Sequence, residues 1–322
     1  MRVLVTGASG FVGSYLIPHL AESGHEVVAV SRSARTFSGA AEVLAWGEDG
    51  PTVDDLLGVD AVVHLAALAH RNSAPAEDYY EINTAVTKLL AERAAEASVA
   101  KFIFLSSSKV HGDRSYPGRP IRSDEPLCPT ANDHYGWSKA AAEFALERVA
   151  NSSAMTVTAL RPPVILGGKP EGNLAAVEKA IAFGLPIPTA KREVKRSFLD
   201  IEDLCDRVAQ VLGLQPTNQF VAELLRSESP TDVIGLLQSF GQTSTRAVRT
   251  IGLPDFLTGA LVKAAGILGR DISPMYREFV LDAGSSTSVS LGTCDYSGRV
   301  HLVDASSDES FFPDSTNSVE MQ

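Results

Sequence analysis

Short apolar runs alternate with amphipathic stretches along the first 160 residues of the chain. The runs have the character of β-strands, and in the stretches between them apolar residues recur every three or four positions, as in helices. The predicted strands are 3–5, 26–30, 61–65, 101–105 and 156–160, and the predicted helices run from the first turn to about 23, over 77–97 and over 135–150. In the second helix, one face carries Tyr80, Asn83, Thr87, Leu90 and Ala94. Strict alternation of strand and helix predicts an α/β fold with a doubly wound parallel sheet.

The pattern changes after Pro162. Glycine and proline become frequent over 162–188, and helical periodicity returns in shorter stretches at 173–183, 201–212 and 231–240. We predict that 1–165 form the doubly wound domain, that 198–225 return to it, and that 166–304 form a smaller mixed α/β domain. Residues 305–322 are rich in serine and acidic side chains and contain no lysine or arginine, which predicts a disordered tail.

Composition excludes several classes of function. The formal net charge of −11 argues against nucleic acid as a partner, because phosphate backbones are bound by clustered Lys and Arg. The longest apolar stretch, 256–268, is interrupted by Lys263 and is shorter than the ~20 residues of a membrane span. Cys128, Cys205 and Cys294 lack the spacing of a metal site, and the first strand leaves no room for a signal peptide. We therefore expect a cytoplasmic protein with reduced thiols, no metal and no membrane span.

A glycine-rich turn joins the first predicted strand to the first helix. Its sequence, TGASGFVG at residues 6–13, contains Gly7, Gly10 and Gly13. These glycines permit a tight turn, a close approach of the backbone to a pyrophosphate and close helix packing. The N–H groups at the start of the helix, around Phe11 and Val12, favour an anion. This arrangement is typical of a Rossmann-type site for NAD(P).

The segment after the second strand bears on which dinucleotide binds. NAD sites usually place a carboxylate there to hold the adenosine ribose, whereas arginine accommodates a 2′-phosphate. Residues 27–41 contain no Asp or Glu but do contain Arg32 and Arg35. We favour NADP(H) over NAD(H), with Arg32 as the first contact and Arg35 as the second. The alternative is that both arginines are solvated surface residues.

A tyrosine and a lysine begin the helix at 135–150. Tyr135 and Lys139 are one helical turn apart on the same face, and we expect the ammonium to lower the pKa of the phenol. Tyr135 could then exchange the proton of a hydroxyl while a hydride moves at the same carbon. The sequence SSSKVHG, residues 106–112, follows the predicted strand at 101–105, where doubly wound folds bind ligands. A serine there can hydrogen-bond the reacting oxygen.

Together these motifs resemble the extended short-chain dehydrogenase/reductase family, in particular its NAD-dependent epimerase/dehydratase group. The resemblance covers about residues 1–240 and includes DAVVHLAA (60–67), LRPP (160–163), GNL (172–174) and RSF (196–198). It implies that Ser107, Tyr135 and Lys139 are catalytic. For the cofactor it implies Gly7, Gly10, Phe11, Val12, Gly13, Leu65, Ala66, Ala67, Asn83, Ser106, Tyr135, Lys139 and Pro162, besides the two arginines. Asn83 either meets the nicotinamide or holds the loop after its neighbouring strand, and we interpret His64 as structural.

The resemblance also implies a nucleotide-sugar substrate held by the 166–304 domain. The implied contacts are Lys109, Asn173, Arg196 and, as a candidate second arginine for the diphosphate, Arg277. Arg196 has a surface salt bridge as its alternative role. Family members commonly pair through two long helices of the Rossmann domain, so a homodimer through 77–97 and 135–150 is expected.

Three reactions are known in this group: 4-epimerisation, 4,6-dehydration and reduction of a 4-keto sugar. Dehydratases carry an acidic pair directly after the catalytic residue, and this chain has Ser108 and Lys109 there, which argues against dehydration. We expect a UDP-hexose or UDP-N-acetylhexosamine 4-epimerase. The alternative is an NADPH-dependent reductase of a nucleotide-linked 4-keto-6-deoxy sugar. A non-catalytic NADP(H)-binding sensor is a third reading, against which the Tyr–Lys pair counts.

Overall fold

A computed structural model describes residues 1–32, 35–47, 50–69, 74–112, 121–167, 183–184, 187–190, 195–226, 231–232 and 250–253 of the chain. At 187–190, 195–196, 231–232 and 250–253 it describes the backbone alone. The strands are β1 (Arg2–Thr6), β2 (Glu26–Ser31), β3 (Ala40–Ala45), β4 (Ala61–His64), β5 (Lys101–Leu105), β6 (Thr156–Arg161), β7 (Val164–Leu166), β8 (Ile187–Ala190), β9 (Lys195–Arg196), β10 (Phe198–Asp200), β11 (Phe220–Leu224), β12 (Thr231–Asp232) and β13 (Thr250–Leu253). The helices are α1 (Phe11–Glu22), α2 (Val53–Leu56), α3 (Ala76–Tyr80), the π-helical η1 (Glu81–Ala85), α4 (Val86–Glu96), the 3₁₀-helical η2 (Ser108–His111), α5 (His134–Asn151) and α7 (Ile201–Gly213).

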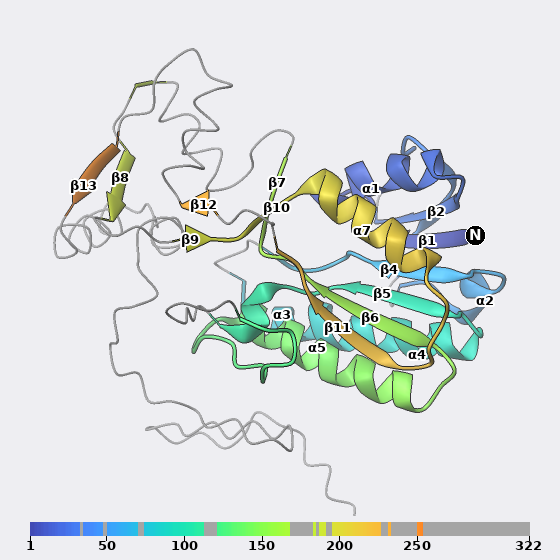
Figure 1. The fold of residues 1–322 in the computed structure, drawn as a ribbon. Helices are drawn as coiled ribbons and strands as arrows, with labels where there is room; N and C mark the ends of the chain where they lie inside the picture. Colours follow the sequence, from blue (N-terminus) through green and yellow to red (C-terminus); the bar gives the residue numbers. More distant parts are fainter. Residues whose placement is uncertain are drawn as a thin grey trace, which may run out of the picture. The chain divides into compact units, whose positions relative to one another are not determined.

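Seven parallel strands form the main sheet, in the order β11-β6-β5-β4-β1-β2-β3 (Figure 1). The chain order of the strands reverses between the neighbours β1 and β4, which pair with Thr6 opposite His64. Doubly wound sheets bind ligands at the carboxyl ends of the strands where this reversal occurs. The predicted α/β doubly wound sheet is confirmed, and the reversal brings the glycine turn after β1 beside residues 65–67 after β4.

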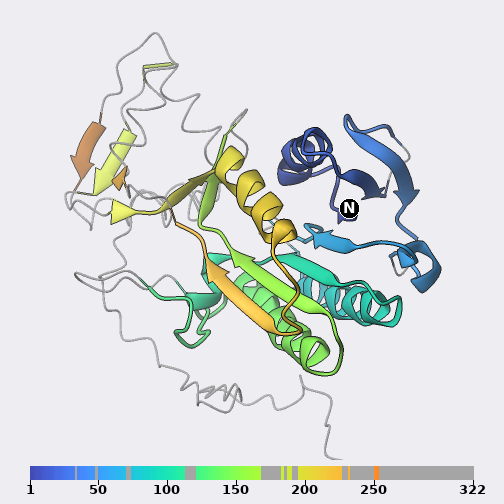
Figure 2. The ribbon, with the colours of Figure 1, turned by 45° about the vertical axis from the view of Figure 1, so that its right-hand side comes forward.

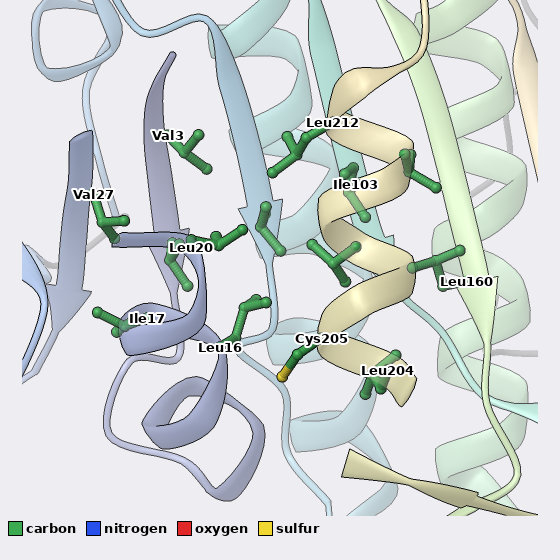
Figure 3. Packing of buried hydrophobic residues seen from close by; sticks show 14 of the residues in the cluster. Val3, Leu16, Ile17, Leu20, Val27, Ile103, Leu160, Leu204, Cys205 and Leu212 are labelled. Carbon is green, nitrogen blue, oxygen red and sulfur yellow. The ribbon is translucent and has the colours of Figure 1, made fainter. Parts of the chain in front are cut away.

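Helices cover both faces of this sheet (Figures 1 and 2). Successive side chains of a strand point to opposite faces, so Val3 and Val5 enter one apolar cluster and Leu4 enters the other. The first cluster includes α1 and α7, whose Leu16 and Leu212 lie over the strands in Figure 3. The second includes α4 and α5. Burial on both faces explains why the strands read as continuous valine-rich runs.

The segment 198–225 supplies β10, α7 and β11. α7 packs against α1, and β11 pairs in parallel with β6 at the edge of the main sheet. Three further two-stranded pairs, β10–β7, β12–β9 and β13–β8, lie apart from that sheet. The boundaries at 165 and 304 stay predictions. The apolar stretch at 256–268 and the tail at 305–322 lie outside the described residues.

The helix expected over 77–97 is interrupted. α3 and α4 are separated by the π-helical η1, and Tyr79 is buried while Tyr80 is 38% exposed. A π-turn closes its hydrogen bonds over five residues instead of four, so the residues before it are rotated relative to those after it. The prediction that Tyr80 shares the buried face of Asn83 and Leu90 was therefore wrong.

Two further differences concern strands. The sequence pattern did not indicate β3, whose side chains are exposed or half-buried and so lack an apolar run. The helix expected over 231–240 does not begin at Thr231, because Thr231 and Asp232 pair antiparallel with Arg196 and Lys195. Pro18 lies inside α1, which continues unbroken from Phe11 to Glu22.

Candidate active site

The glycine turn between β1 and α1 has no room for side chains at two of its three glycines. Gly7 has φ +70°, and a Cβ there would lie 2.7 Å from the backbone nitrogen of Ala66. A Cβ at Gly13 would lie 2.6 Å from the carbonyl oxygen of Gly7. Gly10 caps α1 without a side-chain hydrogen bond, and the first turn has no acidic residue. The open N-terminus of α1 therefore fits the diphosphate of a dinucleotide.

A chain of hydrogen bonds holds the strand end beside this turn. The N–H of Ala66 donates to Thr6 Oγ1 at 3.3 Å, and Thr6 Oγ1 lies 2.7 Å from His64 Nδ1. His64 Nε2 lies 2.9 Å from Thr87 Oγ1, which donates to the Asn83 carbonyl at 2.7 Å. This direction requires a hydrogen on Nε2, and burial, which lowers the pKa of His64 to about 3, favours the neutral ring. These contacts fit the structural interpretation of His64.

Asn83, in η1, uses its whole amide group within the protein. Its Oδ1 accepts from the Leu68 N–H at 2.6 Å, and its Nδ2 donates to the Leu68 carbonyl and to Ser138 Oγ, both at 3.0 Å. These contacts fit the alternative in which Asn83 holds the loop after β4. Leu65, Ala66 and Ala67 at the start of that loop are half-buried.

The two arginines after β2 are on the surface. Arg32 and Arg35 are both exposed, and the Arg35 guanidinium lies 5.5 Å from the centre of the Phe37 ring. No hydrogen bond or ion pair of Arg32 occurs among the residues that the structure describes. The Arg32 charge is therefore available to a ligand. The structure is compatible with both predicted roles of Arg32, the contact with a 2′-phosphate and the solvated surface residue.

Tyr135 and Lys139 lie where α5 begins, and their positions follow from how this helix is capped. Asp133 accepts a hydrogen bond from the Gly136 N–H at 3.0 Å, which fixes the first turn. A Cβ at Gly136 would lie 3.0 Å from the Lys109 carbonyl oxygen, so the start of α5 is close against η2. One turn along, Lys139 is 1% exposed, and its Nζ is 6.0 Å from the centre of the Tyr135 ring.

Residues at the end of β5 hold the ammonium group of Lys139. Its Nζ donates to the Leu105 carbonyl at 2.8 Å and lies 4.4 Å from the centre of the Phe104 ring. Burial lowers the pKa of Lys139 to about 7, against the opposing effect of Glu143. Only the charged form of Lys139 supports a phenolate, and burial disfavours that form.

The expected lowering of the Tyr135 pKa is not present in the chain by itself. Burial raises the pKa of Tyr135 to about 12, although a hydrogen bond with Ser107 acts in the opposite direction. The nearby carboxylate of Asp133 raises the pKa further. Desolvation of the phenolate outweighs the effect of Ser107, and burial also disfavours the charged form of Lys139.

The two serines after β5 have different partners. Ser107 lies near enough to Tyr135 to lower the pKa of its phenol, and its Oγ accepts from the Lys109 N–H at 3.2 Å, where it caps η2. Ser106 is buried, and its hydroxyl donates to Glu143 of α5. The structure thus brings Ser107, Tyr135 and Lys139 together, while the Ser106 hydroxyl is directed into the protein.

Glu143 and Arg161 are polar residues near the site that the sequence did not single out as functional. The Arg161 Nε lies 3.0 Å and 3.1 Å from the two carboxylate oxygens of Glu143, and Nη2 lies 2.5 Å from Oε2. Arg161 Nη1 reaches the Ser123 carbonyl at 2.8 Å and His111 Nε2 at 3.1 Å. The available signals were the position of Glu143 four residues after Lys139 and the arginine of LRPP.

These features together match a known family. The family model described as NAD dependent epimerase/dehydratase family matches residues 3–220 of the chain. The chain belongs to this family. Its fold, with the glycine turn at the point of strand reversal and the Tyr–Lys pair on α5, is that of an extended short-chain dehydrogenase/reductase, as the sequence predicted.

Two curated relatives show how widely the family varies. A protein named UDP-glucose 4-epimerase from Vibrio cholerae is 33% identical over 216 residues, which cover 64% of this chain and 65% of the relative. A protein named sterol-4-alpha-carboxylate 3-dehydrogenase, decarboxylating, from Dictyostelium discoideum is 31% identical over 183 residues, or 52% and 54% of the two chains. The matches thus span about half to two thirds of these relatives.

Solved structures extend the likeness further along the chain. MoeE5 in complex with UDP-glucuronic acid and NAD superposes with a TM-score of 0.67 at 25% identity, over 79% of this chain and 85% of MoeE5. The UDP-N-acetylglucosamine 4-epimerase from Bacillus cereus has the same TM-score at 20% identity, over 78% of this chain and 85% of that one. The second likeness shows the fold alone.

The structure describes some of the remaining predicted site residues and leaves others outside the described part of the chain. The Lys109 Nζ lies 3.4 Å from Asp133 Oδ2, and the Pro162 carbonyl accepts from the Ser108 N–H at 2.9 Å. Arg196 ends β9, of which the backbone alone is described. Asn173 and Arg277 lie outside the described residues, as does Cys294. Within the described part of the chain, Cys128 and Cys205 form no disulfide, and no three or more His, Cys, Asp or Glu side chains are grouped so that they could hold a metal ion. Across the same residues, none of the helices has the length and apolarity of a membrane span.

Proposed function

We propose that this chain is an NAD(P)-dependent nucleotide-sugar 4-epimerase, acting on a UDP-hexose or UDP-N-acetylhexosamine. The observation that carries the proposal is the grouping of Ser107, Tyr135 and Lys139 at the carboxyl end of β5, two strands from the glycine turn. The name of the Vibrio cholerae relative, UDP-glucose 4-epimerase, supports the choice of reaction.

Each of the three residues has a role that follows from its contacts. Tyr135 takes the proton of the sugar C4 hydroxyl as hydride leaves C4, and returns it to the C4 oxygen when hydride comes back on the other face. Ser107, which lies near enough to Tyr135 to lower the pKa of its phenol, is suited to hydrogen-bond the same C4 oxygen. Lys139 in its charged form favours the phenolate. A bound dinucleotide supplies the hydride acceptor and donor, together with positive charge on its oxidised nicotinamide.

For the cofactor, we propose that Gly7, Gly10 and Gly13 admit the diphosphate to the N-terminus of α1. The remaining proposed contacts are Phe11, Val12, Arg32, Arg35, Leu65, Ala66, Ala67, Asn83, Ser106, Tyr135, Lys139 and Pro162. Of these, Asn83 and Ser106 act through the backbone they hold, because their side chains are already paired with protein groups. For the substrate we propose Lys109, Asn173, Arg196 and Arg277.

A second candidate is an NADPH-dependent reductase of a nucleotide-linked 4-keto-6-deoxy sugar. It is favoured by one observation, the exposed Arg32 after β2 in a stretch without carboxylates. An arginine there suits the 2′-phosphate of NADP(H), which a reductase would bind and release in every cycle. We propose NADP(H) as the preferred dinucleotide on the same grounds.

The proposed assembly is a homodimer through the helices of 77–97 and 135–150. Three large apolar side chains on these helices are exposed: Tyr80 at 38%, Ile82 at 40% and Phe144 at 36%. Apolar groups exposed on neighbouring helices are suited to a buried interface. We also propose that the protein works in the cytoplasm and binds no nucleic acid.

The purified protein incubated with UDP- and dTDP-sugars and their 4-keto derivatives, with NADH or NADPH, tests the choice of reaction. Interconversion of two C4 epimers without net loss of reduced dinucleotide is the expected result. Stoichiometric oxidation of NADPH by a 4-keto sugar would instead establish the reductase. Absence of both reactions, with dinucleotide binding intact, would contradict both proposals.

A further inference from the structure

A buried network connects α5 to the end of β5 on the side of the site away from Tyr135. The side chains of Glu143 and Arg161 are 2% and 4% exposed. The Glu143 carboxylate accepts from Nε and Nη2 of Arg161 and from the Ser106 hydroxyl. The backbone of Ser106 is fixed as well, because its N–H donates to the Leu160 carbonyl at 2.7 Å.

A buried ion pair of this kind is a weak source of stability. Removing two charges from water costs several kcal/mol per ion in order of magnitude. Well-packed apolar side chains in place of the ion pair often give a protein of equal or greater stability. Glu143 differs from the carboxylate of a simple ion pair because it has a further partner, the Ser106 hydroxyl. The Ser106 hydroxyl ties the carboxylate to the residue that precedes Ser107, and Ser107 is the serine that lies beside Tyr135 and lowers the pKa of its phenol.

The spacing on α5 gives this contact a consequence for the site. Tyr135, Lys139 and Glu143 follow one another at four-residue intervals and so lie along one face of the helix. The first and last of them lie beside adjacent serines of the same turn, Tyr135 beside Ser107 and Glu143 beside Ser106. The hydrogen bond from Ser106 to Glu143 fixes the direction of that turn where it passes Tyr135. Lys139 lies between them and donates to the Leu105 carbonyl.

We propose that Glu143 is a positioning residue of the active site, which through the Ser106 hydroxyl holds the 106–107 turn so that Ser107 meets Tyr135. Arg161 orients the carboxylate for this contact and anchors it to residue 123 and to His111. The carboxylate also favours the ammonium form of Lys139. The kinetic part of this inference rests on the proposed function, whereas its structural part does not.

Ser106→Ala is the most direct test, because it removes the link and leaves the Glu143–Arg161 pair intact. We expect kcat for C4 epimerisation to fall roughly tenfold or more, with KM and the dinucleotide Kd within about twofold of wild type. Ser106→Thr keeps the hydroxyl and is expected to restore most of kcat. Val211→Ala, in the core of α7, is the control for lost stability and is expected to leave kcat unchanged at a similar loss of Tm.

A double-mutant cycle of Ser106→Ala and Glu143→Gln then asks whether both residues act through one contact. The double variant is expected to have the kcat of the less active single variant. If instead the fold-losses of kcat in the two single variants multiply in the double variant, the residues act independently and the proposal is overturned. If Glu143→Gln does not fold, the serine variants still decide. A kcat loss in Ser106→Ala that Ser106→Thr does not restore, or that Val211→Ala reproduces, would overturn it too.

A structural readout separates this inference from the reaction. Crystal structures of wild type and Ser106→Ala are expected to differ in the distance from Ser107 Oγ to Tyr135 Oη, which lengthens in the variant. An unchanged distance would overturn the positioning role even in a protein with no epimerase activity. Lack of epimerase activity together with a lengthened distance would refute the proposed function alone.

Discussion

Acidification is expected to destabilise the protein through the buried imidazole of His64. The ring is fully buried between Thr6 and Thr87, and burial lowers its pKa from 6.5 to about 3. The unfolded chain therefore binds a proton below pH 6.5 that the native state does not accept until about pH 3. Stability from the neutral ring is present above the ordinary pKa and is lost as the pH falls. The loss for this one group is about 2 kcal/mol between about pH 7 and about pH 5.

Urea unfolding followed by circular dichroism at the two pH values measures this effect. His64→Gln cannot titrate, so its free energy of unfolding is expected to fall by about 2 kcal/mol less than that of wild type over the same interval. Burial and, after it, the charge of Arg161 lower the pKa of His111 to about 4. His111 therefore also reduces the free energy of unfolding on acidification, in wild type and in His64→Gln alike. His134→Gln, at an exposed position, is the control and is expected to keep the wild-type pH dependence. Equal pH dependence in His64→Gln and wild type would refute the neutral, hydrogen-bonded ring.

Three further substitutions test the cofactor site and the assembly. Gly7→Ala places a Cβ 2.7 Å from backbone at φ +70°, so it is expected to abolish dinucleotide binding by calorimetry and to cost about 1–3 kcal/mol of stability in urea. Gly24→Ala, at φ +82° with open space around it, is the control, and loss of binding there too would contradict the steric argument. Arg32→Ala is expected to weaken NADPH binding by about tenfold and to leave NADH binding unchanged; equal effects on both would refute a 2′-phosphate contact. Phe144→Asp is expected to give a monomeric mass by light scattering, while Leu57→Asp, 59% exposed on the surface, keeps the wild-type mass. A wild-type mass for Phe144→Asp would count against the proposed interface.

The spacing of residue types along the chain was sufficient to predict much of the fold. The strands around Val3, Val28 and Ile103 could be predicted because they are buried on both faces and read as continuous apolar runs. The glycine turn could be predicted because the exclusion of a Cβ at Gly7 and Gly13 leaves a direct mark in the sequence. Tyr135 and Lys139 could be paired because the helical repeat fixes their neighbourhood.

Features that depend on contacts between distant residues could not be predicted. The bond between Glu143 and Arg161 joins α5 to β6, and nothing in either local pattern shows that the two meet. The pKa of Lys139 depends on burial against Phe104, which spacing along α5 does not reveal. The π-helical η1, next to the exposed Tyr80, likewise has no counterpart in the apolar repeat of the sequence.

The most direct test of the account is the interconversion of UDP-glucose and UDP-galactose, or of their N-acetyl counterparts, by wild type and Tyr135→Phe. Both proteins are expected to bind the dinucleotide with similar affinity, because the glycine turn is unchanged. Wild type is expected to equilibrate the epimers, and Tyr135→Phe is expected to lose at least about a hundredfold in kcat, the usual contribution of a positioned acid–base group. A Tyr135→Phe variant that epimerises at the wild-type rate would contradict the central claim that this phenol carries the proton.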